Sequence, residues 1–173
     1  MTQHIVIIGA SHAGISCAEQ LRNLGFSGAI TLVDRQAGAP LERPPLSKSY
    51  LGSAPEEDEK FLLRRPEWYD KFQVTMIDGV AVDRIEPETH QIGLADGQSL
   101  NYDKLILATG AIPRTLPPAA GLGNVHVLRN PDDAAALRRT MQTAATAVVI
   151  GGGYIGLEAA ASFRKAGLNV NVI

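Results

Sequence analysis

The sequence predicts an α/β fold that uses one supersecondary unit twice. Near the N-terminus a short apolar strand, a glycine-containing turn and an amphipathic helix follow one another, and the same succession returns near the other end of the chain. The two copies read HIVIIGASHAG and AVVIGGGYIG, and their glycines recur at a constant offset: Gly9, Gly14 and Gly25 reappear as Gly151, Gly156 and Gly167. Such self-similarity indicates an internal repeat, and strands that alternate with helices predict a parallel sheet.

The composition is that of an ordinary globular protein, and it excludes several classes of function. The 173 residues are 45% hydrophobic and 20% charged, and a net charge of −2 gives no bulk attraction to nucleic acid. Apolar runs are too short to span a membrane, and the N-terminus enters a strand pattern at once instead of resembling a signal peptide. The single cysteine, Cys17, cannot build a disulfide framework or a cysteine metal site within this chain. We expect a cytoplasmic protein that uses no metal and binds neither nucleic acid nor membrane.

The first copy of the unit begins with the apolar run 5–8, which is typical of a buried parallel strand. Apolar residues then recur at helical spacing until Gly25, a typical helix stop. A second apolar run over 30–33 is closed by Asp34. These segments predict a strand–helix–strand unit with the glycine turn between its first strand and its helix.

The middle of the chain predicts a small β-rich insert. Residues 35–60 are rich in proline and include an acidic run over 56–59, which forms either a solvated loop or a surface that a partner recognises. Pro66 suits the first turn of a short helix, and Asp96-Gly97 is a strong hairpin signal between two short strands. The remaining expectations are strands over 74–76, 80–85, 91–94, 99–100 and 105–108 and helices over 66–72 and 131–143.

The two glycine turns are the candidates for chemistry. In a dinucleotide-binding turn one glycine allows the tight bend, a second lets the backbone approach a pyrophosphate, and a third lets the helix pack against the strand. The helix N-terminus then offers N–H groups to the anion. The second copy has all three glycines, whereas Ser11 stands in the middle place of the first. Asp34 follows Gly14 at the distance expected for a carboxylate that holds a ribose hydroxyl. The alternative is an ordinary α/β turn without a ligand.

The second copy is not completed within the sequence. Counted from Gly156, the matching acidic residue is expected at about 174–176, beyond Ile173. We therefore expect the chain to be a fragment of a longer enzyme, cut within its second dinucleotide-binding unit.

Four segments carry a resemblance to a known family. GASHAG, ERPPLSKSYL, LATGAIPR and GGGYIGLEAA occur in this order. With them the chain resembles the FAD-dependent NAD(P)H–ferredoxin reductases of the putidaredoxin and rubredoxin reductase type, within the glutathione-reductase-like flavoprotein superfamily. The resemblance implies a Rossmann-like FAD-binding domain with a small β-meander insert over 1–113. It also implies the beginning of a second Rossmann-like domain, for NAD(H) or NADP(H), over 114–173.

The resemblance further implies the reaction, in which electrons pass from NAD(P)H through FAD to a ferredoxin or rubredoxin-type iron–sulfur protein. Disulfide reductases of the superfamily carry a cysteine pair beside the flavin, whereas the segment RPPLSK contains none. The chain therefore has no thiol relay for the electrons, and the resemblance implies that they leave singly through the flavin. One alternative is a non-catalytic FAD-binding module or a truncation product. Among enzymes, the alternatives are an NADH oxidase and an apoptosis-inducing-factor-like reductase.

The same resemblance implies the site residues. Lys48 and Glu158 are the implied catalytic residues, and we predict that they pair near the flavin N5 edge. Taken alone, Lys48 is a solvated lysine on a short helix and Glu158 is a carboxylate that its helix dipole stabilises. The residues implied to bind FAD are Gly9, Ser11, His12, Ala13, Gly14, Asp34, Arg35, Arg43, Lys48, Val82, Ala108, Thr109, Gly110 and Arg129. Those implied to face the nicotinamide dinucleotide are Gly151, Gly153, Tyr154, Ile155, Gly156 and Glu158.

Overall fold

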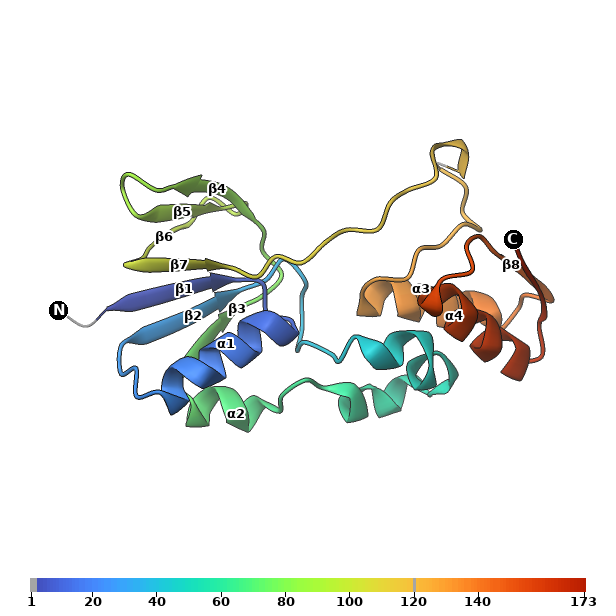
Figure 1. Cartoon of the computed structure of the whole chain (residues 1–173), viewed down its shortest axis with the longest axis horizontal. Helices are drawn as coiled ribbons and strands as arrows, with labels where there is room; N and C mark the ends of the chain where they lie inside the picture. The colour runs from blue at the N-terminus through green and yellow to red at the C-terminus, as the bar shows by residue number, and fades with distance from the viewer. Residues whose placement is uncertain (1–2, 120) are drawn as a thin grey trace. The chain divides into compact units, whose positions relative to one another are not determined.

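The computed structural model describes residues 3–119 and 121–173. The chain packs as two compact units (Figure 1). The first unit contains the residues up to Leu41 together with Leu62–Gly110, and the second contains Glu42–Phe61 together with Ala111–Ile173. By packing, the segment 42–61 therefore goes with the C-terminal part of the chain. The functional division into domains over 1–113 and 114–173 stays a prediction.

The first unit is built on a four-stranded parallel sheet in the order β3-β2-β1-β7. Helix α1 lies between β1 and β2 in the sequence, as the strand–helix–strand pattern predicted, and the parallel pairing of its strands is confirmed. The elements are β1 (His4–Ile8), α1 (His12–Asn23), β2 (Ala29–Val33), α2 (Pro66–Lys71), β3 (Val74–Ile77) and β7 (Lys104–Leu107).

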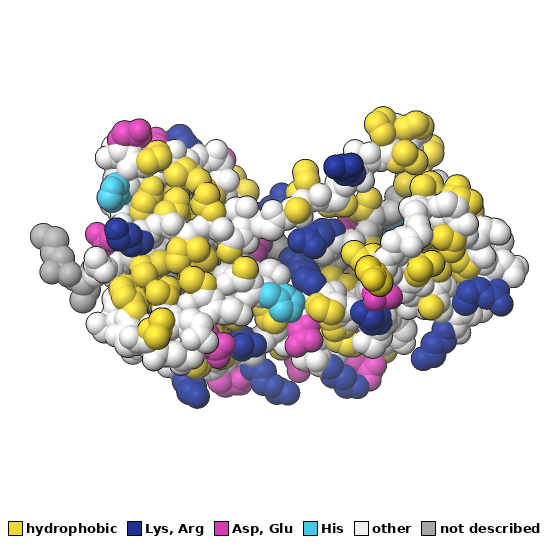
Figure 2. Space-filling view, in the orientation of Figure 1, with side chains coloured by type: hydrophobic (Ala, Val, Ile, Leu, Met, Phe, Trp, Pro, Cys, Tyr) yellow, Lys and Arg dark blue, Asp and Glu magenta, His cyan; other side chains and the backbone are white. Residues whose placement is uncertain are grey.

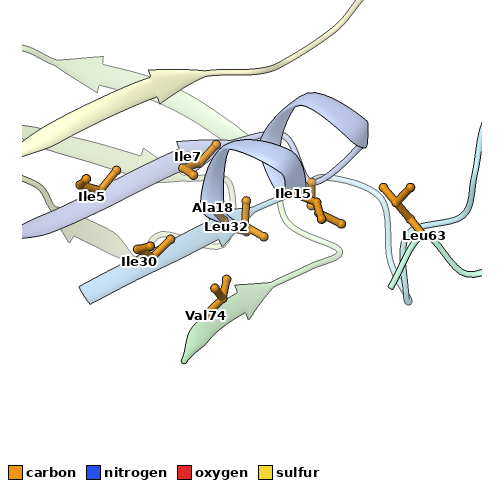
Figure 3. Close-up of a cluster of buried hydrophobic side chains, with 9 residues drawn as sticks. Ile5, Ile7, Ile15, Ala18, Ile30, Leu32, Leu63 and Val74 are labelled. Carbon is orange, nitrogen blue, oxygen red and sulfur yellow. The ribbon is translucent and has the colours of Figure 1, made fainter. Parts of the chain in front are cut away.

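The core of this unit lies between the sheet and the helices. Alternate residues of β1 and β2 point to the face that α1 covers, because successive side chains of a strand point to opposite faces. Burial of each large aliphatic side chain stabilises the fold by about 2 kcal/mol. Figure 3 shows side chains of the strands and of α1, with Leu63 beyond Ile15. The buried cluster is Ile5, Ile7, Ala10, Ile15, Ala18, Ile30, Leu32, Leu63 and Val74.

A three-stranded antiparallel sheet covers apolar side chains on the other face. It consists of β4 (Val82–Glu86), β5 (Gln91–Leu94) and β6 (Ser99–Asn101) in that order. The predicted hairpin is confirmed, since the N–H of Gly97 donates to the carbonyl of Leu94 across 2.9 Å. A second buried cluster lies between the two sheets and consists of Val6, Ile8, Val33, Ile92 and Leu94. The strand predicted over 80–85 begins at Val82, and its register shifts between Val82 and Arg84.

The second unit contains the repeated supersecondary unit. Strands β8 (Thr146–Val149) and β9 (Asn169–Val172) pair in parallel on either side of α4 (Tyr154–Lys165) in the sequence. Helix α3 (Pro131–Met141) begins with a capping box, in which the Asn130 side chain accepts from the Asp133 N–H and the Asp133 carboxylate accepts from the Asn130 N–H. The cap confirms the start of the predicted helix, which ends two residues earlier than expected.

The segment 42–61 is helical, so the prediction of a loop over its acidic run 56–59 was wrong. It forms three 3₁₀ helices: η1 (Pro44–Ser47), η2 (Ser49–Gly52) and η3 (Pro55–Phe61). Prolines suit the first turns of η1 and η3 and do not interrupt a helix there. The apolar residues Leu46, Tyr50 and Leu51 are buried, which the proline pattern did not reveal.

The acidic run within η3 is not simply solvated, because Asp58 joins a partly buried polar cluster. Its carboxylate accepts hydrogen bonds from both terminal nitrogens of Arg138, at 2.9 and 3.2 Å, and from the Tyr50 hydroxyl at 2.9 Å. The Arg138 guanidinium also lies 4.5 Å above the Tyr50 ring. Burial raises the pKa of Tyr50, and the neighbouring carboxylate raises it further. Among the described residues, no helix is long and apolar enough to cross a membrane.

Candidate functional site

In the turn between β1 and α1, the main chain at the glycines lies in direct contact with other main-chain atoms. Gly9 has φ of 106°, where a side chain is rarely tolerated, and a Cβ placed on it would overlap the carbonyl oxygen of Ala108. A Cβ on Gly14 would overlap the carbonyl oxygen of Gly9. The first N–H groups of α1 have no partner within the helix. The turn therefore leaves main-chain donors at the start of α1, which suit an anionic pyrophosphate.

Asp34 closes this turn from the end of β2. Its Oδ2 accepts the Ala10 N–H at 2.7 Å, and its Oδ1 accepts the Gln36 N–H at 2.9 Å. The carboxylate is thereby fixed beside the glycine turn. Each carboxylate oxygen has a further lone pair, so Asp34 can also accept hydrogen bonds from hydroxyl groups of a ligand.

The other predicted residues of the first unit lie after β7, on the insert, at the start of α1 and after β2. Ala108 donates to the Ile8 carbonyl across 2.8 Å, which places the end of β7 beside the end of β1. Thr109 and Gly110 follow it and are exposed, and Val82 starts β4 on the insert. His12, Ala13 and Arg35 are exposed. The structure thus gathers Gly9, Ser11, Gly14, Asp34 and Ala108 at the carboxyl ends of parallel strands, where α/β sheets bind ligands.

In the second unit the predicted ion pair between Lys48 and Glu158 is confirmed. Lys48 Nζ lies 3.0 Å from Oε1 of Glu158, with the two side chains 52% and 32% exposed. The Ser47 hydroxyl donates to the other carboxylate oxygen, Oε2, across 2.6 Å. The hydrogen bond from Ser47 and then that from Lys48 hold the pKa of Glu158 below its ordinary value. The carboxylate is therefore ionised at neutral pH, and it fixes the ammonium group.

Two arginines predicted to contact FAD are held together in this unit. Arg43 Nη1 donates to the carbonyl oxygen of Arg129 across 2.8 Å. Arg129 in turn donates from Nε to the carbonyl of Ala111 across 3.0 Å. Its backbone N–H donates to Asp133 across 2.8 Å, which joins it to the start of α3.

The second glycine turn reproduces the backbone of the first. Gly151 has φ of 107°, and a Cβ on Gly156 would overlap the carbonyl oxygen of Gly151. Gly153 stands at the N-cap of α4. Tyr154 and Ile155 are 88% and 54% exposed, and Figure 2 shows exposed hydrophobic side chains on this unit. The turn can offer the same main-chain donors as the first.

Two serines were missed by the sequence analysis. Ser47 immediately precedes Lys48, and Ser162 follows Glu158 by one helical turn and donates to the Ser47 carbonyl across 2.9 Å. The i, i+4 spacing of Glu158 and Ser162 was the available signal, because it places both side chains on one face of α4. Arg138 and Asp58 gave no such signal, since 80 residues separate them.

The comparison with protein families matches the chain over residues 3–173 to the family described as pyridine nucleotide-disulphide oxidoreductase. Rhodocoxin reductase of Rhodococcus erythropolis is 47% identical over 170 residues, which are 98% of this chain and 40% of that protein. Putidaredoxin reductase of Pseudomonas putida is 40% identical over 174 residues, which are 98% of this chain and 41% of that protein. The chain spans about two fifths of the length of these curated relatives.

Solved structures show the same similarity. The reductase in the covalent putidaredoxin reductase–putidaredoxin complex superposes with a TM-score of 0.91 at 41% identity, covering 98% of this chain and 42% of that one. A ferredoxin reductase from Rhodopseudomonas palustris superposes with a TM-score of 0.93 at 37% identity, covering 99% of this chain and 42% of that one. The α/β fold with its parallel sheet and three-stranded insert therefore matches the N-terminal part of reductase structures.

Proposed function

The chain belongs to the pyridine nucleotide-disulphide oxidoreductase family, and we propose that it supplies the N-terminal part of an FAD-dependent NAD(P)H–ferredoxin reductase. The observation that carries this proposal is the combination of the Gly9 turn with the Lys48–Glu158 pair in one chain. The relatives named rhodocoxin reductase and putidaredoxin reductase support it, since they align along nearly the whole of this chain.

In this proposal the first unit binds FAD. The N–H groups at the start of α1 receive the pyrophosphate, and the absence of side chains at Gly9 and Gly14 lets it approach the backbone. Asp34 accepts from the adenosine ribose while it keeps the turn closed. FAD, when bound, accepts a hydride and passes on single electrons. The residues of this unit expected to complete its site are Ser11, His12, Ala13, Arg35, Val82, Ala108, Thr109 and Gly110. Arg43, Lys48 and Arg129 belong to the second unit, and their contacts with FAD stay predictions.

The second glycine turn binds the nicotinamide dinucleotide in the same way. Gly151, Gly153 and Gly156 present the backbone at the start of α4, and the exposed Tyr154 and Ile155 are free to contact the ligand. The Lys48–Glu158 pair orients the reacting groups by its fixed charges. Hydride transfer itself requires no proton transfer by these side chains, because the cofactors carry that chemistry.

The proposed electron acceptor is a ferredoxin or rubredoxin-type iron–sulfur protein. One solved relative, putidaredoxin reductase, supports this proposal because its structure is that of a covalent complex with putidaredoxin. The segment RPPLSK offers no cysteine pair that would divert electrons to a thiol. A cytoplasmic location stays a prediction.

The proposal is tested on the full-length protein that contains this chain. We expect this protein to purify with flavin absorbance, and NADH or NADPH to bleach that absorbance under anaerobic conditions. The reduced protein should then reduce a [2Fe–2S] ferredoxin faster than it reduces oxygen. If the bleached flavin reduced only oxygen, the protein would be an oxidase and not a ferredoxin reductase. A protein that holds no flavin, or whose flavin neither nucleotide bleaches, would contradict the proposal itself.

A further inference from the structure

The hydroxyl of Ser47 is a buried anchor for Glu158. Ser47 ends η1 and is only 5% exposed, and its Oγ donates to Oε2 of Glu158 across 2.6 Å. The other carboxylate oxygen, Oε1, faces Lys48 Nζ at 3.0 Å. One side of the carboxylate is therefore fixed to a buried group, and the other side is presented to a half-exposed lysine.

A second serine holds the anchor in place. The Ser162 hydroxyl donates to the Ser47 carbonyl oxygen across 2.9 Å. Ser162 and Glu158 lie one turn apart on the same face of α4. Glu158 accepts the Ser47 hydroxyl, and Ser162 donates to the Ser47 carbonyl. The end of η1 and the carboxylate are thus joined at two points.

Lys48 does not fix this geometry alone. Its ammonium group is carried on a flexible four-carbon stem, and its side chain is 52% exposed. Its further hydrogen bond, to the Pro44 carbonyl, is long at 3.4 Å. The terminal torsion of a glutamate is broad, so a carboxylate without an anchor would turn with the lysine. A short hydrogen bond from a buried hydroxyl to a charged oxygen prevents that rotation.

We propose that Ser47 is a positioning residue, whose hydroxyl orients the Glu158 carboxylate and thereby fixes the Lys48 ammonium for hydride transfer. The link to hydride transfer rests on the proposed function. The positioning of the pair rests on the contacts alone, so the two can be tested separately.

Zero-length cross-linking tests the positioning without any turnover. A carbodiimide joins a carboxylate to a touching amine as an amide, and the carboxyl oxygen leaves as a urea. We expect the full-length protein to yield a Lys48–Glu158 cross-link, quantified by peptide mass spectrometry against the Lys60–Glu57 ion pair as an internal standard. Ser47→Ala should lower the yield several-fold, and Ser47→Thr, which keeps the hydroxyl, should restore much of it.

The matched control is Ser49→Ala, an exposed serine one residue beyond Lys48, which should leave the yield unchanged. Equal yields from wild type and Ser47→Ala would overturn the inference. Flavin absorbance and melting temperature of each variant show whether the protein has folded.

Stopped-flow reduction by NADH or NADPH tests the link to the reaction. We expect Ser47→Ala to lower the limiting rate about tenfold, the effect of losing a hydrogen bond to a charged group, with little change in the dissociation constant of the nucleotide. In a Glu158→Gln background the same change should have no further effect, since Ser47 acts through Glu158. Additive losses, or an unchanged limiting rate in the single variant, would overturn that link. A wild-type flavin that neither nucleotide reduces would instead contradict the proposed function, and the cross-link would still decide the positioning.

Discussion

The two glycine turns share their local geometry and differ in what surrounds them. Gly9 and Gly151 have φ of 106° and 107°, and in each copy a Cβ on the helix glycine would overlap the carbonyl oxygen of the first glycine. Beside the first turn lie a four-stranded sheet and the Asp34 carboxylate. Among the described residues, the second turn follows a two-stranded sheet.

The turn itself is thus encoded locally, whereas the atoms packed against its first glycine come from a neighbouring strand. A Cβ on Gly9 would overlap the Ala108 carbonyl at the end of β7, while one on Gly151 would meet no described atom within 4 Å. The apolar residues of β1 are all buried, but Val148 on β8 is 59% exposed. Within the described residues, the same turn is therefore packed against a neighbouring strand in the first unit and not in the second.

The largest expected effect is on the first turn. In the full-length protein, Gly9→Ala combines an unfavourable φ with an overlap of backbone atoms, so we expect it to purify without flavin absorbance. Gly151 has the same φ but lies in the second unit, so Gly151→Ala should keep its flavin and bind NADH or NADPH more weakly. The ratio of visible to ultraviolet absorbance and a nucleotide titration measure the two effects. Equal flavin content in both variants would break the comparison.

The next effect concerns Asp34. Asp34→Asn leaves one of the Ala10 and Gln36 N–H groups without an acceptor, because an amide nitrogen only donates. We expect FAD affinity to fall by roughly tenfold to a hundredfold, as for a lost hydrogen bond to a charged group. Asp103→Asn is the matched control: Asp103 accepts the His4 N–H across 2.6 Å at the other end of β1, away from the turn. Flavin titrations that give equal affinities for the two variants would show that Asp34 plays no part in binding.

Sequence reasoning predicted the elements that a local pattern encodes. The strands of the first unit, the hairpin at Asp96-Gly97 and both glycine turns were found, because strand runs and turn residues act over a few positions. The pair of Lys48 and Glu158, which lie 110 positions apart in the sequence, came from family resemblance and not from a pattern. Physical reasoning from residues alone gives no signal for a contact at that separation.

Sequence reasoning failed where tertiary packing decides. The acidic run 56–59 indicated a solvated loop, but it lies in η3, where Asp58 bonds to Arg138. Leu46, Tyr50 and Leu51 of the same segment are buried. Ser47 was overlooked because its role depends on Glu158, which the fold brings to it from α4.

The two units also differ in what stabilises them, and a smaller effect tests this. The first unit rests on an apolar core, whereas the second includes the polar cluster around Arg138, whose side chain is 11% exposed. Arg138→Ala leaves Asp58 and Tyr50 partly desolvated without the guanidinium group, so we expect the free energy of unfolding to fall by about 2 kcal/mol. Limited proteolysis should then cut within 42–61 more rapidly. Arg139→Ala, the exposed neighbour, is the control; equal cleavage rates would mean that the cluster does not hold the segment.

The smallest expected effect is a pH dependence confined to the second unit. Burial raises the pKa of Asp58, but hydrogen bonds from Arg138 and Tyr50 outweigh it and hold the pKa below its ordinary value of 3.8. A carboxyl group whose pKa is lowered on folding stabilises the fold fully above its unfolded pKa, and this stabilisation is lost as the pH falls through the folded pKa. Because the Asp58 side chain is 35% exposed, solvent screening limits the contribution to less than about 1 kcal/mol. Melting temperatures of wild type and Asp58→Asn should therefore differ at pH 6. The difference should begin to shrink at about pH 3.8, the unfolded value, and vanish as the pH falls through the lower folded pKa. Asp96→Asn, an exposed carboxylate in the hairpin of the first unit, is the control. A difference that persisted undiminished at low pH would show that Asp58 acts through its shape and neutral hydrogen bonds, and the contrast between an apolar unit and a charge-dependent one would then fail.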